Sequence, residues 1–184
     1  RLGRKTRLPE SQRKVLWDIF EQIQSKLADE QLATLPTVFS RLAEATGQRK
    51  HPPYEFAVID EAQDINVAQL RFLAALGGDR PNSLFFAGDL GQRIFQTPFS
   101  WKSLGVDVRG RSRTLRINYR TSHQIRRQAD LLLGPEVSDV DGNIEKRSST
   151  VSVFNGPLPE IAICDSAEQE VNKVGEWLRS LSGE

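Results

Sequence analysis

The segment YEFAVIDEAQD, residues 54–64, places acidic side chains directly after a short apolar run. Because FAVI is continuous rather than alternating, it predicts a strand covered on both faces, with Asp60 and Glu61 at its carboxyl end. Ligands bind at that end of the strands in open α/β sheets. The pair suits nucleotide hydrolysis, in which Asp60 would hold Mg²⁺ and Glu61 would orient and deprotonate the attacking water. A solvated acidic turn is the simpler alternative.

Two further segments supply other groups that such a reaction needs. GDLGQRIF, residues 88–95, follows a second apolar run, and its Gln92 could contact a γ-phosphate. LRINYRTS, residues 115–122, holds Arg120 between a strand and a helix, where it could supply positive charge to the transition state. Either residue taken alone is more often structural. The acidic pair and these two segments, in this order, together predict phosphoryl-transfer chemistry.

Composition narrows the class of protein. The 184 residues are 38% hydrophobic, which is enough for a core, and no apolar run is long enough to cross a membrane. The single cysteine, Cys164, lies in EIAIC, which predicts a buried strand; one unpaired cysteine indicates a reducing, cytoplasmic setting. His51 and His123 are far apart in sequence and have no cysteine nearby, so a zinc site is not expected.

The charge is unevenly distributed along the chain. Net charge is only +1, yet the stretch from Arg109 to Arg127 contains seven arginines and no acidic residue. Such a stretch suits a partner that carries phosphates, or it forms a solvated basic face. The chain contains no methionine and begins on Arg1, and we therefore expect it to be a fragment excised from a longer protein.

The elements that must position these residues follow from periodicity and capping. Helices are expected after Pro9, over 36–45, from Asn66 to Gly77, from Thr121 or Ser122 to Gly134, and after the capping box Ser166–Gln169. Strands are expected at FAVI, SLFFAGD (83–89), TLRIN (114–118), TVSVF (150–154) and EIAIC (160–164), with 135–150 as a loop. This alternation predicts an α/β fold, with a mostly parallel sheet and flanking helices.

The segments VIDEAQD, GDLGQRIF and LRINYRTS resemble motifs II, III and IV of superfamily 1 helicases of the UvrD/Rep/PcrA type. The resemblance covers residues 54–133, and three motifs in this order and spacing are highly specific. It implies a RecA-like P-loop NTPase fold of two domains with ATP and Mg²⁺ bound between them. It also implies 3′–5′ movement along single-stranded or partly duplex DNA.

The resemblance also implies roles for individual residues of VIDEAQD, the segment that resembles motif II. Asp60 corresponds to the aspartate that holds Mg²⁺, and Glu61, beside the metal, to the catalytic base. Gln63 and Asp64 belong to the same motif and are expected to support nucleotide binding.

The other two motifs imply contacts with nucleotide. Gln92 corresponds to the glutamine that senses the γ-phosphate. Tyr119 corresponds to the tyrosine that stacks on adenine, and Arg120 to the arginine finger.

The family's third motif also carries aromatic residues that stack on DNA bases. Phe95 corresponds to the first of these, whereas the second, normally a tryptophan two positions further on, is replaced by Thr97. Either Phe99 or Trp101 takes that role, or the base platform is reshaped. Stacking on aromatic side chains tolerates any DNA sequence, as a translocase needs. Alternatively, both side chains pack beneath the sheet.

Two parts of the family's pattern do not occur in the chain. There is no G-x-x-x-x-G-K-[ST] phosphate loop, which lies N-terminal to this region in the family, and there are no motifs V and VI, which lie C-terminal. A fragment explains both, and we expect it to be inactive by itself. Residues 1–50 would end the accessory subdomain and return from it, 51–113 would complete the first RecA-like domain, and 114–184 would begin the second, with the loop VRGRS (108–112) at the hinge.

Two other functions are compatible with parts of the pattern. A non-hydrolysing scaffold that binds nucleic acid could keep the fold without the phosphate loop, but it has no chemical need for Glu61. A nuclease could use DEAQD to hold two metals, but it leaves Gln92 and Arg120 without roles.

Overall fold

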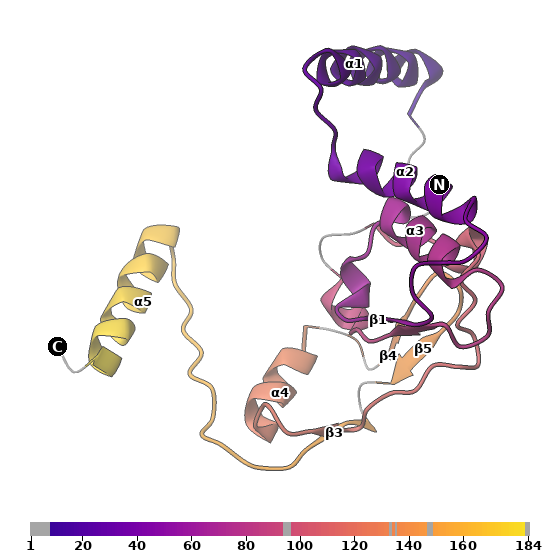
Figure 1. Ribbon diagram of the computed structural model, residues 1–184. Coiled ribbons are helices and arrows are strands. Elements are labelled where there is room, and N and C mark those ends of the chain that lie inside the picture. The colour runs from indigo at the N-terminus through magenta and orange to yellow at the C-terminus, as the bar shows by residue number, and fades with distance from the viewer. Residues whose placement is uncertain (1–7, 94–96, 133, 135, 147–148, 183–184) are drawn as a thin grey trace. The chain divides into compact units, whose positions relative to one another are not determined.

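The computed structural model describes residues 8–93, 97–132, 134, 136–146 and 149–182 (Figure 1). It is a mixed helix and strand structure with short parallel strand pairs, as an α/β class requires. In chain order the elements are α1 (Glu10–Asp29), α2 (Leu35–Gly47), β1 (Ala57–Ile59), α3 (Val67–Gly77), β2 (Leu84–Phe86), β3 (Ile117–Asn118), α4 (His123–Asp130), β4 (Glu136–Ser138), β5 (Ile144–Lys146), β6 (Val151–Ser152) and α5 (Ala167–Ser182).

The chain divides into two compact units. The first contains the described residues up to Leu115 and those of Leu133–Ser149, and the second those of Arg116–Leu132 and from Thr150 onward. VRGRS, just before the division, forms turns without helix or strand, as predicted. No helix in the described part of the chain is both long and apolar enough to cross a membrane.

The first unit is built around a β1–α3–β2 crossover. The two strands run parallel in the register Ala57↔Leu84 to Ile59↔Phe86. Helix α3 begins at a complete capping box, in which Asn66 and Gln69 each bond the other's backbone N–H at 2.9 Å. It ends at Gly78, which has a φ of 54°. The crossover brings the carboxyl ends of both strands to the same edge.

The core of this unit lies on one face of the strand pair. Leu70 of α3 is completely buried and packs with Ala62, Ile65 and Val106. A larger set of partly buried side chains surrounds this cluster: Ile59, Leu73, Ala74, Leu84, Phe86, Phe99, Trp101, Leu104 and Val108. Helix α2 packs against α3 (Figure 1). Between these helices the ring centroids of Phe39 and Phe72 are 5.8 Å apart.

The prediction that FAVI is covered on both faces is wrong for this structure. Ala57 and Ile59 are half-buried, but Val58 is 76% exposed, and its partner in β2, Phe85, is 63% exposed. Side chains alternate across a strand, and only one face of this pair meets α3 and the segment after Phe99. A continuous apolar run therefore indicates two apolar faces without determining what covers them.

Residues 135–150 were predicted as a loop, and this is also wrong in part. β4 and β5 form an antiparallel hairpin in the register Glu136↔Lys146. Its turn is closed by Asp139, whose carboxylate accepts hydrogen bonds from Asn143 N at 2.8 Å and from Asn143 Nδ2 at 2.6 Å. Strands of three polar-rich residues carry little hydrophobic periodicity, so the pattern did not indicate them.

Asp141 in the hairpin turn fixes the segment that follows Phe99. Its carboxylate accepts hydrogen bonds from Ser100 Oγ at 2.5 Å, Trp101 N at 2.7 Å and Lys102 N at 3.0 Å. Burial raises the pKa of Asp141, but these three hydrogen bonds and the charge of Arg109 outweigh it, so the pKa lies below its ordinary value. The bonds hold Trp101 where its ring contacts Phe86 edge-on, with centroids 4.8 Å apart.

The second unit repeats the parallel arrangement on a smaller scale. β3 pairs with β6 in the register Ile117↔Val151. Ser122, which is 3% exposed, caps α4 through the N–H of Ile125, and His123 N donates to Phe154 O at 3.1 Å. The helix that was expected after Thr121 or Ser122 therefore begins after Ser122.

EIAIC was predicted as a strand, and this prediction is wrong. Residues 160–164 have no regular structure, and Ile163 is 92% exposed. Strand propensity alone does not form a strand without a neighbour to complete its hydrogen bonds. Cys164 is half-buried, not part of a buried strand.

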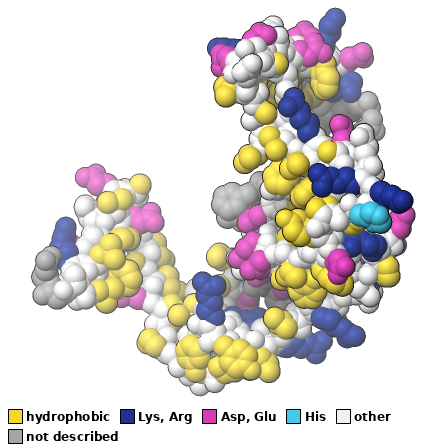
Figure 2. Space-filling view, in the orientation of Figure 1, with side chains coloured by type: hydrophobic (Ala, Val, Ile, Leu, Met, Phe, Trp, Pro, Cys, Tyr) yellow, Lys and Arg dark blue, Asp and Glu magenta, His cyan; other side chains and the backbone are white. Residues whose placement is uncertain are grey.

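The outer helices form as predicted, but their apolar faces are exposed. α1 and α5 contain no buried residue among those described, and Val171 and Leu178 of α5 are 70% and 54% exposed (Figure 2). Ile125 of α4 is 50% exposed, and Leu132, just beyond the helix, is 88% exposed. Helical spacing specifies an apolar face, whereas burial requires a second surface.

Replacing Asp141 by alanine should lower the free energy of unfolding by about 2 kcal/mol at pH 7, because three donors lose a charged acceptor. A carboxyl whose folded pKa is depressed stabilises the fold above its unfolded pKa of about 3.9, and this stabilisation is lost as pH falls through the lower folded pKa. The difference between Asp141→Ala and the parent chain should therefore diminish below about pH 4.

Urea unfolding of both chains between pH 3 and pH 7 measures this. Asp18→Ala, at an exposed position of α1, is the control and should change stability by less than about 0.5 kcal/mol throughout. A difference for Asp141→Ala that stays constant across this pH range would contradict the role of its charge.

Candidate active site

Asp60 and Glu61 occupy a tight turn directly after β1. The Asp60 carboxylate accepts a hydrogen bond from Glu61 N at 2.9 Å, and both side chains are exposed. Glu61 has φ 51° and ψ 41°, the left-handed region that costs a residue with a Cβ about 1–2 kcal/mol. The turn then continues as a 3₁₀ helix, Ala62–Asp64, in which Asp64 is exposed. Such strain is found where the surrounding structure over-determines the backbone, which includes active sites.

Gln63 joins this turn to the segment that follows β2. It is 5% exposed, and its Nε2 donates to Glu61 Oε2 at 2.6 Å. Its Oε1 accepts from Asp89 N at 3.0 Å. The backbone adds a second connection, because Ala62 N donates to Ala87 O at 2.8 Å. The segment that contains residues 60–64 and the segment GDLGQRIF are therefore in direct contact at the edge where both strands end.

Gly88 allows that approach. A Cβ at this position would lie 2.6 Å from Gln63 Oε1 and 3.0 Å from Ala62 N. The backbone of Gly88 is not in the left-handed region, so glycine is required here because two segments pass too close for a side chain.

Asp89 fixes Gln92. The Asp89 carboxylate accepts from Gly91 N at 2.8 Å and from Gln92 Nε2 at 3.0 Å, closing the 3₁₀ turn Leu90–Gln92. Gln92 itself is exposed. Sequence interpretation assigned no role to Asp89, although the repeated pattern of an apolar strand followed by an acid indicated it.

The donor set fits Mg²⁺ and the terminal part of a nucleotide. Mg²⁺ keeps several waters and is held by one or two carboxylates together with substrate phosphates, so the exposed pair of Asp60 and Glu61 is sufficient. Within the described ranges no cluster of three or more His, Cys, Asp or Glu side chains is present. Gln92 offers amide N–H groups to a phosphate from the same edge.

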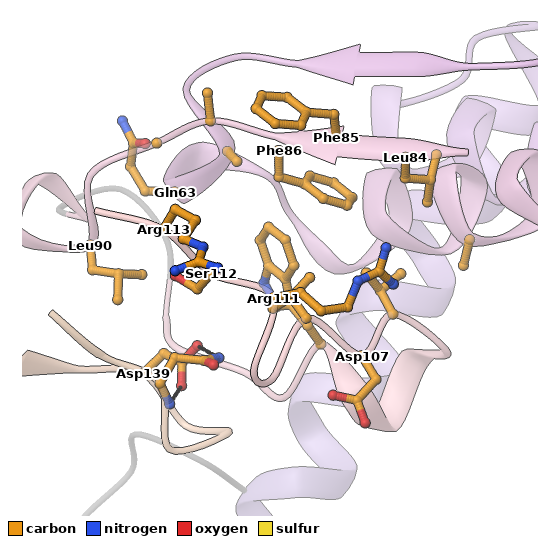
Figure 3. A pocket seen from close by; sticks show the side chains of 18 of the residues that line it. Gln63, Leu84, Phe85, Phe86, Leu90, Asp107, Arg111, Ser112, Arg113 and Asp139 are labelled. Atoms are coloured by element: carbon orange, nitrogen blue, oxygen red, sulfur yellow. Dashed lines mark hydrogen bonds between the residues drawn. The ribbon is translucent and has the colours of Figure 1, made fainter. Parts of the chain in front are cut away.

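A cavity of about 850 Å³ lies beside this edge (Figure 3). It is lined by Gln63, Asp89 and Phe86 as well as Arg113, but not by Asp60, Glu61 or Gln92, and we therefore do not place the reacting phosphate in it. Asp107 also lines it, and the hydrogen bonds from Arg109 hold the pKa of that carboxyl well below its ordinary range.

The aromatic residues proposed to stack on DNA bases differ in their surroundings. Phe95 lies outside the described residues. Phe99 and Trp101 are partly buried against the core, and the Trp101 ring contacts Phe86. These contacts favour the packing alternative for both side chains, whereas Thr97 is exposed.

Tyr119 and Arg120 lie in the second unit, at the end of β3. Both are exposed, Tyr119 to 72%. Asn118 holds the turn: its Oδ1 accepts from Arg120 N at 2.8 Å and its Nδ2 donates to Thr121 Oγ1 at 2.6 Å. Sequence interpretation assigned no role to Asn118, although Asn after a strand is a turn signal.

A model of one protein family, the UvrD/REP helicase N-terminal domain, matches residues 7–100. This range includes the β1–α3–β2 crossover and both segments that form its functional edge, but not Tyr119 or Arg120. No curated protein sequence matches the chain.

The strained backbone at Glu61 can be measured with a pair of substitutions. Glu61→Gly and Glu61→Ala both remove the carboxylate and its bond with Gln63, so their difference isolates the backbone. Because only glycine is relaxed at a φ of 51°, we expect Glu61→Gly to be more stable than Glu61→Ala by about 1 kcal/mol.

Asp18→Gly and Asp18→Ala in α1 are the control pair, and there the order should reverse by about 1 kcal/mol because glycine is a poor helix residue. Urea unfolding of the four variants gives both differences. The same order at both positions would show that Glu61 is not strained.

Proposed function

The chain belongs to the UvrD/REP helicase N-terminal domain family, and from this we propose that it is the central part of an ATP-dependent DNA helicase or translocase. On this proposal the fold is RecA-like, and the enzyme couples ATP hydrolysis to 3′–5′ movement on single-stranded DNA. The observation that supports it most is the junction of Glu61 with Asp89 through Gln63, because it joins VIDEAQD and GDLGQRIF, the segments that resemble motifs II and III, at the carboxyl ends of two parallel strands.

Each residue at that edge has a chemical role on this proposal. Asp60 would hold Mg²⁺, and Glu61 beside it would accept the proton of the attacking water. Gln92 donates its amide N–H to the γ-phosphate. The metal, when bound, neutralises charge on the phosphates. Gln63 and Asp64 support the turn that carries the two carboxylates.

The second unit would contribute two further residues. Tyr119 would stack on adenine, and Arg120 would place its guanidinium on the charge that develops in the transition state. The turn held by Asn118 and the cap at Ser122 support this role, because they fix the backbone on both sides of Arg120.

We propose the following domains for the chain. Residues 1–50 end an accessory subdomain, 51–113 complete the first RecA-like domain, and 114–184 begin the second. The division of the chain after Leu115 supports the boundary between the last two, although the hairpin β4–β5 is grouped with the first unit.

DNA in single-stranded or partly duplex form is the proposed partner, and the cytoplasm the proposed compartment. Seven arginines between Arg109 and Arg127 support contact with a phosphate backbone. Phe95 is the proposed base-stacking residue, whereas the contacts of Phe99 and Trp101 with the core favour packing for both.

A scaffold that binds nucleic acid without hydrolysis is the second candidate. The 184 residues contain no phosphate-cradling loop, which is the observation in its favour. The retention of Glu61 in a strained turn favours the enzyme, because a scaffold gains nothing from that strain.

The 184-residue chain by itself should not hydrolyse ATP, because Gln92 and Arg120 cannot position a nucleotide whose other phosphates are unheld. Phosphate release by the purified chain, with and without single-stranded DNA, measures this. Turnover stimulated by DNA and abolished by Glu61→Gln would contradict it.

In the full helicase that contains this segment, Glu61→Gln should lower ATP turnover by roughly 10²–10⁴-fold, because it removes the base and keeps the side chain's size. Nucleotide affinity and DNA binding should be preserved. Asp60→Asn should instead weaken Mg²⁺-dependent nucleotide binding.

Titrations with a fluorescent ATP analogue and a labelled oligonucleotide, run beside steady-state phosphate release, separate the two effects. Parental turnover in Glu61→Gln would remove the catalytic assignment and favour the scaffold.

A further inference from the structure

We propose that Gln63 is the positioning residue for the catalytic base: it orients Glu61 and couples it, through Asp89, to the γ-phosphate contact Gln92. The inference rests on the proposed function. It is carried by a series of hydrogen bonds through four residues, Glu61, Gln63, Asp89 and Gln92, which connects the two segments at the edge of the β1–β2 pair.

The orientation of the Gln63 amide is determined by its two partners. Oε1 faces a backbone N–H, that of Asp89, and Nε2 faces the carboxylate of Glu61. An amide turned by 180° would set donor against donor at Asp89 and acceptor against carboxylate at Glu61. Because the side chain is 5% exposed, water cannot readily replace either partner.

Glu61 depends on this bond for its orientation. Its carboxylate is exposed, and among the described residues Gln63 provides its only hydrogen bond from another side chain. A glutamate in solvent otherwise samples several rotamers. A base that activates one particular water must be held in one of them, since displacement by about 1 Å can cost 10²-fold in rate.

Asp89 transmits the connection to Gln92. The backbone N–H of Asp89 is bonded to Gln63, and its carboxylate is bonded to Gln92 Nε2. If the Gln92 amide moves toward a phosphate, its hydrogen bond with the Asp89 carboxylate changes, and Asp89 is the residue whose N–H holds Gln63. Gln63 thus bonds both Glu61, which would accept the proton, and Asp89, which holds the Gln92 that would contact the phosphate.

Gly88 provides an independent way to disturb this arrangement. A Cβ there would lie 2.6 Å from Gln63 Oε1, so Gly88→Ala should displace the amide without changing Gln63 itself. This variant tests the proposal even if substitutions at Gln63 impair folding.

The experiment measures ATP turnover in the full helicase stimulated by single-stranded DNA. We expect Gln63→Ala and Gly88→Ala each to lower kcat by about 10–10²-fold while the KM for ATP stays within about 3-fold. Gln63→Glu should lower kcat at least as far, because it places a second carboxylate against Glu61. Gln69→Ala, which removes half of the α3 capping box, is the matched control and should lower thermal stability while kcat stays near the parental value.

A double-mutant cycle separates positioning from a merely structural role. In the Glu61→Gln background, Gln63→Ala should lower kcat by less than about 3-fold further, because a residue that acts through Glu61 has nothing left to orient. Multiplicative losses would overturn the proposal, as would near-parental kcat in Gln63→Ala or, if that variant does not fold, in Gly88→Ala. Parental turnover in Glu61→Gln would instead remove the proposed function itself, so the two failures are distinguishable.

Discussion

The parallel pairing of β1 with β2 is the constraint on which the rest of the site depends. Parallel strands require a crossover, and α3 provides it, with Leu70 buried beneath both strands. Both strands then end at one edge, and every acid or amide that follows them is brought to that edge. Asp60 and Asp89 are 29 positions apart by their numbers, yet a single glutamine bridges their segments.

The polar groups at this edge are supported by close backbone approach as much as by their own bonds. Gly88 lets the two segments touch, and Ala62 N completes a backbone bond across them. Further along the chain, the β4–β5 hairpin contacts the turn that contains Gln92, and Asp141 fixes the segment of Trp101. The candidate site is thus supported by the core and by the β4–β5 hairpin, which the hydrophobic pattern of the sequence did not predict.

Three segments led to the chemistry proposed for the site, because side chains suited to catalysis are few and their order along the chain is characteristic. Capping residues predicted helix starts because capping is a local interaction: Asn66 and Ser122 each accept a hydrogen bond from an N–H group in the first turn of the helix they begin. The sequence did not predict the exposed faces of Val58 and Phe85, nor the irregular structure of 160–164. Both depend on a covering surface or a pairing strand elsewhere, and propensity carries no information about either.

The sequence by itself determined which side chains are chemically suited to catalysis, where helices begin and that strands alternate with helices, because these properties are local. Only the tertiary structure decided that Gln63 bridges Glu61 to Asp89, that Gly88 is required by a close approach and not by its φ, and that Trp101 packs on Phe86. The reason is physical: a hydrogen bond or a contact between distant segments depends on distance in space, and that distance is set by the packing of α3 against the paired strands.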